Sequence, residues 1–363
     1  MTSTIDATQF DPSTVDEAKM DELAGRIITD VGGAASAGLV VLGDRLGLYA
    51  ALARGPATAD ELAERTGTAA LYVAPWLGNQ AAGGYVEYDA ETGRFWMTPE
   101  QTMAFVVEDG PAFFPGAFQL VMALLRDTPS FEERFRTGEG FGWHEHDVDL
   151  FEGTARFFRP GYVANLVDSW LPALDGVVDK LRAGADVADW GCGHGVSTIL
   201  MAQSFERSRF IGSDYHEASI VAARRKAEQA GVGDRVRFEV ADASAAPEQD
   251  FDLITMFDCL HDMGDPDSAA TAARQALRPG GTLMVVEPAA GDRVQDNLNP
   301  VGRVYYAGST LICTPASLSQ PGARALGAQA GPAVLTALLR EAGFGSVRVA
   351  VQTPVNLVIE ARP

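Results

Sequence analysis

The arrangement of apolar and polar positions divides the chain into a helical first half and a second half of alternating strands and helices. Apolar residues recur at helical spacing over about residues 19–53, although Gly32 and Gly33 weaken the middle of that stretch. After about residue 182, short apolar runs alternate with helical stretches. Strands that alternate with helices predict an α/β domain with a parallel sheet.

Two short helices are predicted before residue 84. Thr58 and Glu61 have the spacing of a capping box that starts the first of them. Thr68 is the expected cap of the second. Pro75 falls inside this second helix, where the loss of a backbone hydrogen bond is expected to kink or break it.

A hairpin follows these helices, because two short runs, 85–88 and 94–98, flank a turn. Helix, turn, helix and hairpin is the layout of a winged helix. A helix that reads DNA needs Arg, Lys, Asn or Gln against the bases, but residues 68–86 contain no charged side chain. We therefore interpret residues 19–105 as a winged-helix-like packing or dimerisation domain.

Residues 106–182 are predicted to be mostly helical and are interpreted as a linker and lid region. Within them, the segment 138–149 contains Trp143, His144 and His146. Two histidines this close can bind a metal, but a solvated loop or a lid over a site is the interpretation we favour.

The predicted strands of residues 183–363 end in a hairpin. The last two, 347–351 and 357–361, are joined by a segment too short for a helical crossover, so we expect them to pair antiparallel. Parallel strands that finish in an antiparallel hairpin differ from ordinary dinucleotide-binding folds.

A long insertion, 290–331, follows the fifth predicted strand. Long ordered insertions often cover a substrate, and an ordinary packing segment is the equal alternative. Tyr305 and Tyr306 would suit an aromatic ligand.

Charge and length narrow the possible partners. The 363 residues are enough for two domains, and the net charge of −21 repels phosphate backbones and anionic lipids. Nucleic acid and membranes are therefore poor partners. The apolar runs are too short to cross a bilayer.

The termini and cysteines favour a cytoplasmic protein. Residues 1–18 are acidic and polar, unlike a signal peptide, and are expected to be flexible. The three cysteines form no Cys-x-x-Cys pair and suit a reducing compartment. Scarce lysine with abundant alanine and glycine suggests a bacterial source.

The most specific motif is Val187–Gly195, which reads Val-Ala-Asp-Trp-Gly-Cys-Gly-His-Gly and ends the first predicted strand. Glycines there allow a tight turn and close approach of a ligand, and the exposed N–H groups favour a carboxylate or another polar group. The Gly-x-Gly-x-Gly spacing differs from the Gly-x-Gly-x-x-Gly of dinucleotide sites, which argues against a nicotinamide oxidoreductase.

Acidic residues follow the next two predicted strands. Asp214 can accept hydrogen bonds from both hydroxyls of a ribose, and Asp242, followed by Ala243, can accept one from an adenine amino group. An isolated aspartate at a strand end is usually a helix cap. The glycine loop and both aspartates at three consecutive strand ends form a much more specific pattern.

At these positions the chain resembles the class I S-adenosylmethionine-dependent methyltransferases. The resemblance covers about residues 185–363 and rests on the Asp189–Gly195 loop, Asp214, Asp242, the turn Leu277–Gly281 and the terminal hairpin. The N-terminal half resembles that of two-domain small-molecule methyltransferases, which include plant O-methyltransferases and bacterial natural-product methyltransferases. The runs Gly191–Gly195, Phe257–Asp265 and Thr353–Glu360 look like those of a group of bacterial methyltransferases.

The resemblance implies a Rossmann-like seven-stranded sheet, S-adenosyl-L-methionine as cofactor, and a homodimer formed through the N-terminal domain. On the methionine side of the cofactor it implies contacts from Asp189, Gly191, Gly193, Gly195, Phe257 and Asp258. On the nucleoside side it implies contacts from Asp214, Tyr215, Asp242 and Ala243.

His261 is the candidate general base. A phenol or acid becomes a better methyl acceptor when it is deprotonated, and histidine suits that task. The run 261–265 resembles the His-Asp-Trp-x-Asp of plant-type O-methyltransferases, whose histidine is the base, and Glu287 matches a glutamate that orients it. Met263 replaces the aromatic residue of that run. The alternative is that His261 has only a structural role at a helix start.

Three nearby aspartates offer a metal alternative. Asp262, Asp265 and Asp267 could imitate the ligands of metal-dependent catechol-type methyltransferases. Beside Gly264, in a turn, they more simply cap the next helix, so no metal is predicted.

We therefore predict an enzyme that methylates a small molecule, favouring an oxygen of an aromatic or natural-product-like acceptor, with nitrogen or carbon also open. The alternative is a non-catalytic winged-helix regulator that senses S-adenosylmethionine. The uncharged second helix of the N-terminal domain argues against that alternative.

Overall fold

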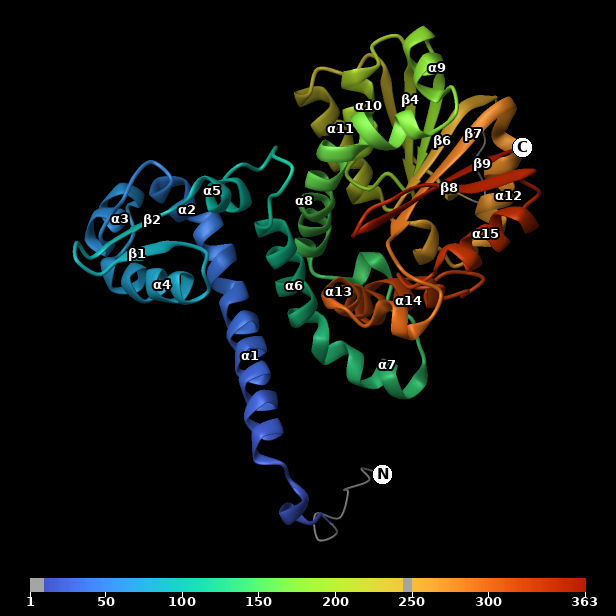
Figure 1. The fold of residues 1–363 in the computed structure, drawn as a ribbon. Helices are drawn as coiled ribbons and strands as arrows, with labels where there is room; N and C mark the ends of the chain where they lie inside the picture. Colours follow the sequence, from blue (N-terminus) through green and yellow to red (C-terminus); the bar gives the residue numbers. More distant parts are fainter. Residues whose placement is uncertain (1–9, 244–249) are drawn as a thin grey trace. The chain divides into compact units, whose positions relative to one another are not determined.

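The computed structural model describes residues 10–243 and 250–363. It divides into two compact units, Met1–Val106 and Val107–Pro363 (Figure 1). The first half of the N-terminal segment expected to be flexible, residues 1–9, lies outside the described residues. Its described part forms a short 3-10 turn, Pro12–Thr14, before the first long helix.

The first unit starts with a long helix. α1 (Glu17–Arg45) includes Gly32 and Gly33 without interruption, so the expected weakness at these glycines is absent. Gly47, with φ 68°, separates α1 from α2 (Leu48–Leu52). The single helix expected over residues 19–53 therefore ends earlier, at a left-handed glycine.

The capping box predicts the next helix correctly. α3 (Ala59–Thr66) starts after Thr58, whose side chain accepts from the Glu61 backbone, while the Glu61 side chain accepts from the Thr58 backbone. Gly67 ends α3 in a left-handed conformation, as expected for a helix C-terminus.

The second of these helices begins later than predicted. α4 (Ala70–Ala82) starts after Ala69 and has no side-chain cap, so the prediction for Thr68 was wrong. The helix also continues through Pro75. The unit is completed by the predicted hairpin and a further helix: β1 (Glu87–Asp89), β2 (Arg94–Trp96) and α5 (Pro99–Phe105).

The second unit opens with helices that precede its sheet in the sequence. They are α6 (Pro115–Asp127), α7 (Phe131–Thr137), α8 (Val148–Asn165) and α9 (Val177–Ala183), joined by 3-10 and π turns. α6 and α8 pack closely because glycines lie at their contact. A Cβ on Gly116 would lie 2.4 Å from Arg156 Cβ, and one on Gly153 would lie 2.7 Å from the Leu120 nitrogen.

The sheet has the predicted architecture. Its strands are β3 (Asp186–Trp190), β4 (Arg209–Asp214), β5 (Val236–Val240), β6 (Phe251–Phe257), β7 (Leu277–Pro288), β8 (Ser346–Gln352) and β9 (Asn356–Arg362). The order is β5-β4-β3-β6-β7-β9-β8. β9 runs antiparallel to β7 and β8, and the other pairs are parallel. The Leu277–Gly281 segment forms the first part of β7 instead of a separate turn.

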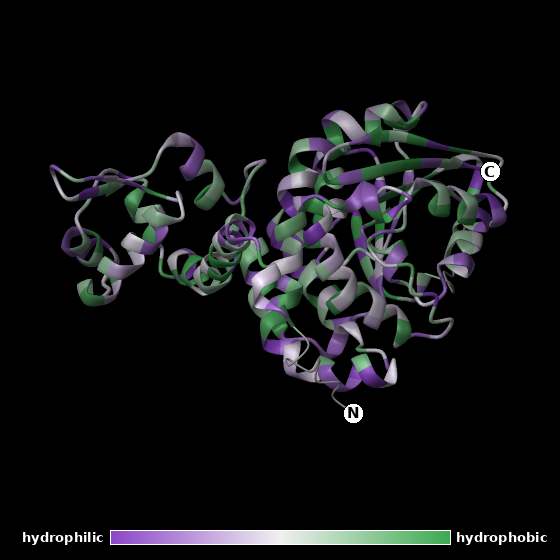
Figure 2. Cartoon of the chain, turned by 60° about the horizontal axis from the view of Figure 1, so that its bottom comes forward, coloured by the Kyte–Doolittle hydropathy of each residue, from purple (hydrophilic) through white to green (hydrophobic). Residues whose placement is uncertain are grey.

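Helices cover both faces of this sheet, and its strands are mostly hydrophobic (Figure 2). One core, with Ile199 and Phe210, lies beneath α10 (Val196–Ser204) and α11 (Glu217–Gln229). The other core lies beneath two helices on the opposite face, α12 (Pro266–Ala276) and α15 (Pro332–Glu341). The insertion after β7 forms α13 (Pro300–Gly308), a π turn (Ser309–Cys313) and α14 (Thr314–Leu318). The carboxyl ends of the parallel strands meet at one edge, where α/β proteins bind ligands.

Candidate functional site

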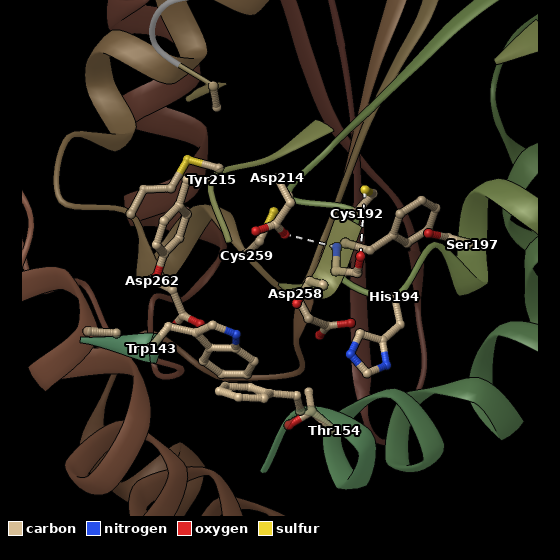
Figure 3. A pocket seen from close by; sticks show the side chains of 18 of the residues that line it. Trp143, Thr154, Cys192, His194, Ser197, Asp214, Tyr215, Asp258, Cys259 and Asp262 are labelled. Carbon is tan, nitrogen blue, oxygen red and sulfur yellow. Dashed lines mark hydrogen bonds between the residues drawn. The ribbon is translucent and has the colours of Figure 1, made fainter. Parts of the chain in front are cut away.

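A cavity of about 290 Å³ opens at the carboxyl ends of β3, β4 and β6, within the second unit (Figure 3). Its wall combines the loop after β3, residues at the strand ends, and side chains of the helices that precede the sheet. The cavity lies where the sequence predicts a cofactor.

The three glycines of the loop between β3 and α10 have different surroundings. Gly191, Gly193 and Gly195 all have positive φ, between 51° and 74°, which glycine adopts without a steric cost. Gly191 and Gly193 line the cavity, and a Cβ on Gly193 would meet nothing within 4 Å. A Cβ on Gly195 would lie 2.5 Å from the Phe238 ring. The missing side chain at Gly193 therefore leaves open space for a ligand, whereas at Gly195 it leaves the space that the Phe238 ring occupies.

Asp189 lies beneath the loop and not on the cavity wall. Its carboxylate accepts hydrogen bonds from the hydroxyls of Ser197 at 2.7 Å, Thr198 at 2.5 Å and Thr255 at 2.9 Å. Burial raises the pKa of Asp189, against the effect of these hydroxyls. The side chain thus connects β3 to α10 and β6, and the role at the methionine portion that the resemblance implies stays a prediction.

Asp214 connects the loop to the cavity. Its Oδ2 accepts from the backbone N–H of Gly193 at 2.9 Å, the dashed line from Asp214 in Figure 3, and its Oδ1 accepts from that of His216 at 2.9 Å. Burial raises the pKa of Asp214. A carboxylate oxygen accepts more than one hydrogen bond, so Asp214 can hold the loop and still bind hydroxyl groups of a ligand.

Most of the predicted cofactor residues are brought together. Eight of them line the cavity: Gly191, Gly193, Asp214, Tyr215, Asp242, Ala243, Phe257 and Asp258. The Tyr215 side chain offers a flat, partly exposed surface. Asp189 and Gly195 support this wall from behind.

Asp258 has the most unusual environment of these residues. Its φ of 50° is uncommon for a side-chain-bearing residue, and the Tyr162 hydroxyl donates to its Oδ2 at 2.9 Å. Its Oδ1 is buried and has no hydrogen-bond partner among the described residues. Burial, with the nearby Glu287 carboxylate, raises the pKa of Asp258 to about 8. Strain and an unsatisfied buried oxygen together mark a position that serves a ligand.

His261 and Glu287 form the predicted pair. Nδ1 of His261 contacts Oε2 of Glu287, whose Oε1 accepts from the Leu260 backbone at 3.0 Å. Nε2 of His261 lies 3.0 Å from Oδ1 of Asp262. Burial acts to lower the pKa of His261, but the two carboxylates outweigh it and raise that pKa well above its usual value.

Asp262 lies between His261 and the cavity. The cavity wall includes Asp262 but neither His261 nor Glu287, both of which are buried. The structure thus places the candidate base immediately behind the wall and not on it.

The aromatic part of the wall was not predicted. Phe151, Thr154, Ala155, Phe158 and Tyr162 of α8 line the cavity. Their spacing of three and four residues places them on one face of the helix, so a helical periodicity within 148–165 was the signal that could have found them.

The segment 138–149 contributes Trp143 to the cavity wall. Trp143 lines the cavity, in agreement with a lid. His146 is buried, lies 2.7 Å from an Asp127 oxygen through Nδ1, and packs against Phe141. His146 therefore stabilises the segment, and the metal interpretation for His144 and His146 finds no support in this arrangement.

The insertion 290–331 contributes to the cavity wall through other residues than Tyr305 and Tyr306. Tyr305 is buried and its hydroxyl donates to the Val355 carbonyl at 2.5 Å. Neither Tyr305 nor Tyr306 is part of the cavity wall, so of the two alternatives for this part of the insertion the arrangement favours packing. Later residues of the insertion take that place: Ala316, Gln320 and Pro321.

The aspartates that follow His261 behave mainly as helix-start residues. Asp265 caps α12 by accepting from the Ser268 backbone at 2.9 Å. Asp267 pairs with Arg324 at 3.3 Å on the surface. Asp265 and Asp267 thus have other partners, as expected for residues at a helix start.

Two family descriptions match this chain. Residues 181–317 match a methyltransferase domain, and residues 34–106 match an Rv2258c-like winged HTH domain. The first match confirms the cofactor prediction, S-adenosyl-L-methionine, and the second confirms the winged-helix prediction.

Curated relatives match up to about half of this chain. A 27-O-demethylrifamycin SV methyltransferase of Amycolatopsis mediterranei is 33% identical over 188 residues, 50% of this chain and 64% of the relative. A ubiquinone/menaquinone biosynthesis C-methyltransferase of Vibrio campbellii is 28% identical over 46% of this chain and 67% of its own length. This chain thus spans less than two thirds of the rifamycin relative.

Solved structures match nearly the whole fold. The mitomycin 7-O-methyltransferase MmcR has a TM-score of 0.67 at 20% identity and covers 96% of this chain and 100% of its own. Human N-acetylserotonin methyltransferase, in complex with SAM, has a TM-score of 0.68 at 16% identity, with 96% and 99% covered. At these identities the similarity establishes the fold, and it confirms the predicted combination of a Rossmann-like sheet with a helical N-terminal domain.

Proposed function

We propose that this chain, which belongs to the two-domain class I S-adenosylmethionine-dependent methyltransferases, methylates an oxygen of a small aromatic acceptor. The observation that carries the proposal is the composition of the cavity wall. The glycine loop and Asp214 form one part of it, and aromatic side chains, with Trp143 and Phe151 among them, form another. The O-methyltransferases of rifamycin and mitomycin among the similar proteins support an acceptor of this kind.

The residues of the cofactor side fit S-adenosylmethionine. Open space at Gly193 gives room for close approach, and Asp214 presents a buried carboxylate to hydroxyl groups. The unpartnered Oδ1 of Asp258 suits a hydrogen-bond donor of the ligand. When bound, the sulfonium supplies an activated methyl group. The chain's own task is to hold the two reactants in line and to exclude water.

We assign the acceptor's proton to the pair formed by Asp262 and His261. Asp262 faces the cavity, and its carboxylate lies 3.0 Å from Nε2 of His261, so a proton taken from an acceptor hydroxyl passes between them. Glu287 orients the imidazole through Nδ1. Because the pKa of His261 is raised, the pair accepts protons best at alkaline pH.

Polar groups of the acceptor have two candidate partners on the wall. Thr154 Oγ1 is buried and without a hydrogen-bond partner in the part of the chain that the structure describes. The Gln320 side chain also lines the cavity, although its amide binds the Asp262 and Ala316 carbonyls. We therefore propose a planar acceptor whose ring lies against the aromatic residues of α8 and whose second polar group reaches Thr154.

We further propose that two copies associate through α1. This helix exposes large apolar side chains: Leu23 at 43%, Ile27 at 48%, Ile28 at 71% and Val31 at 58% of their surface. Residues 32–38 are glycine, alanine and serine, which let a second helix approach closely. A second copy buries these side chains by helix packing.

The same helix is apolar enough by length and composition to cross a membrane. Packing against a second copy suits α1 better than a membrane does, because only 13 residues separate Asp30 from Asp44. At 1.5 Å per residue they span about 20 Å, short of the roughly 30 Å of a bilayer core. We propose a cytoplasmic location, since all three cysteines are free.

A methylation screen tests this function. The protein is incubated with S-adenosylmethionine and a panel of phenols, naphthols and hydroxyquinones, and S-adenosylhomocysteine and products are quantified by mass spectrometry. We expect O-methylated products from at least one planar acceptor, abolished in Asp214→Ala and slowed in His261→Gln. Products methylated only at nitrogen or carbon would refute the oxygen assignment, and a full rate in His261→Gln would refute the base.

A further inference from the structure

Three side chains with metal-binding groups meet beside the cavity. The ligand atoms of His261, Asp262 and Cys313 all lie within 4.8 Å of one another. His261 and Asp262 follow β6, whereas Cys313 comes from the π turn between α13 and α14. His261 and Cys313 are buried, and Asp262 extends to the cavity wall.

We propose that these residues form a zinc site with His261, Asp262 and Cys313 as its protein ligands. Imidazole, carboxylate and thiolate are the groups that bind Zn²⁺ in proteins, and sulfur disfavours Mg²⁺ and Ca²⁺. Three protein ligands leave the fourth tetrahedral position for water or another ligand, which the cavity beside Asp262 can supply. This site is distinct from the acidic cluster of Asp262, Asp265 and Asp267, whose last two members have other partners.

The surroundings of His261 support metal binding. A metal-bound histidine almost always uses its other ring nitrogen to contact a carboxylate or carbonyl. Here Nδ1 contacts Glu287, which is 1% exposed and is itself held by the Leu260 backbone N–H. Nε2 is thereby fixed towards Asp262.

The Asp262 side chain can move to bring the three ligand atoms to zinc-binding distance. Zinc–ligand distances of 2.0–2.3 Å require ligand atoms about 3.3–3.6 Å apart, so the widest pair must close by about 1 Å. Oδ1 of Asp262 is buried and lies 3.0 Å from Nε2 of His261. A rotation of the Asp262 side chain would exchange this contact for bonds of both groups to the metal.

The local charge also favours a cation. The carboxylates of Asp262 and Glu287 provide two negative charges, and the Cys313 thiolate that forms when the metal binds provides a third around one zinc ion. Binding forms Zn–N, Zn–O and Zn–S bonds, the thiol proton of Cys313 and the Nε2 proton of the charged imidazole leave to solvent, and no atom is oxidised or reduced.

Zinc at this site has a consequence that rests on the proposed function. The metal would use the Nε2 lone pair that accepts the acceptor's proton. Zinc binding and general-base catalysis by His261 would then exclude each other, which makes the metal an inhibitor.

The test uses the full-length protein after metal removal and under reduction. Zn²⁺ is titrated against a chromophoric chelator, and Co²⁺ is added to a second sample for absorption spectroscopy. Cys313→Ser removes the proposed sulfur ligand. Cys192→Ser is the matched control, since it also removes a buried thiol but lies outside the cluster.

We expect one Zn²⁺ per chain and a thiolate-to-cobalt charge-transfer band, both lost in Cys313→Ser and kept in Cys192→Ser. Glu287→Gln should weaken zinc binding by about 10–100-fold, the usual effect of removing a carboxylate behind a metal-bound histidine. Equal zinc affinity in wild type and Cys313→Ser, or a cobalt spectrum of the wild type without the thiolate band, would overturn the proposal. The cobalt spectrum needs no variant and decides the matter even if Cys313→Ser fails to fold.

S-adenosylhomocysteine is titrated into the same metal-free samples. Binding of this compound without binding of zinc would refute the metal site alone. Absence of both would refute the proposed function as well.

Discussion

Alanine at Gly193 and alanine at Gly195 should affect different properties of the glycine loop. Both residues have positive φ, 51° and 74°, so each substitution carries a similar backbone strain of about 1–2 kcal/mol. The new methyl group at Gly193 meets nothing within 4 Å and projects into open space beside the cavity. The one at Gly195 lies 2.5 Å from the Phe238 ring, an overpacking that costs about 1–3 kcal/mol more.

Gly193→Ala should therefore unfold with a free energy about 1–2 kcal/mol below wild type, and Gly195→Ala about 2–5 kcal/mol below. Cofactor binding should show the opposite order. A methyl group where the ligand approaches should weaken S-adenosylhomocysteine binding by at least about tenfold, or 1.4 kcal/mol, in Gly193→Ala.

Urea denaturation of both variants measures the stabilities, and calorimetric titration measures the affinities. The reasoning would be refuted if Gly193→Ala bound S-adenosylhomocysteine as tightly as wild type. Equal stability of the two variants would refute the packing role assigned to Gly195.

Three further substitutions test other parts of the structure. The folded-state pKa of Asp258 is raised to about 8, so the folded protein holds a proton that the unfolded chain releases above about pH 4. The free energy of unfolding therefore falls as pH rises from about 4 to 8. In urea denaturation Asp258→Asn should gain stability relative to wild type across that range, and a constant difference would argue against the raised pKa. The raised pKa of His261 also makes stability fall as pH rises, but in a higher window: its contribution is full below about pH 6.5 and is lost as pH rises through the folded pKa. His261→Gln should therefore lose most stability at acidic pH, and an equal loss at pH 6 and pH 10 would contradict this. Ile28→Glu places a charge on the exposed face of α1 and should turn a dimer into a monomer in sedimentation experiments at unchanged helix content. Ile28→Ala is the milder control. A dimer that persists in Ile28→Glu would exclude this face as the dimer interface.

Local patterns predicted most of the framework. The strands follow from short apolar runs, because parallel strands buried on both faces contain almost only apolar residues. Glycines and aspartates that follow consecutive strands meet at one edge, which is why Gly193, Asp214 and Asp242 could be assigned from their order alone. Helix caps were predicted where side chains supply them, at Thr58, and missed at α4, where Ala69 has no capping side chain.

The acceptor side of the cavity could not be predicted in the same way. Helical spacing within 148–165 shows which residues of α8 share a face, but it does not show that this face, with Phe158, lines the cavity beside the glycine loop. The same limit explains Tyr305, whose aromatic ring suggested a substrate contact but whose hydroxyl instead binds the Val355 carbonyl, 50 residues away in sequence. The three hydroxyl partners of Asp189 could not be predicted because they come from two different elements.

The account rests most directly on the cofactor site. The decisive measurement is calorimetric titration of S-adenosylmethionine and S-adenosylhomocysteine into wild type and Asp214→Ala. The account predicts saturable binding of both compounds at one site per chain in wild type. Asp214→Ala should weaken this binding by about tenfold or more, because the variant loses the charged acceptor for ribose hydroxyls. Wild-type protein that binds neither compound, or a variant that binds both as tightly as wild type, would contradict it.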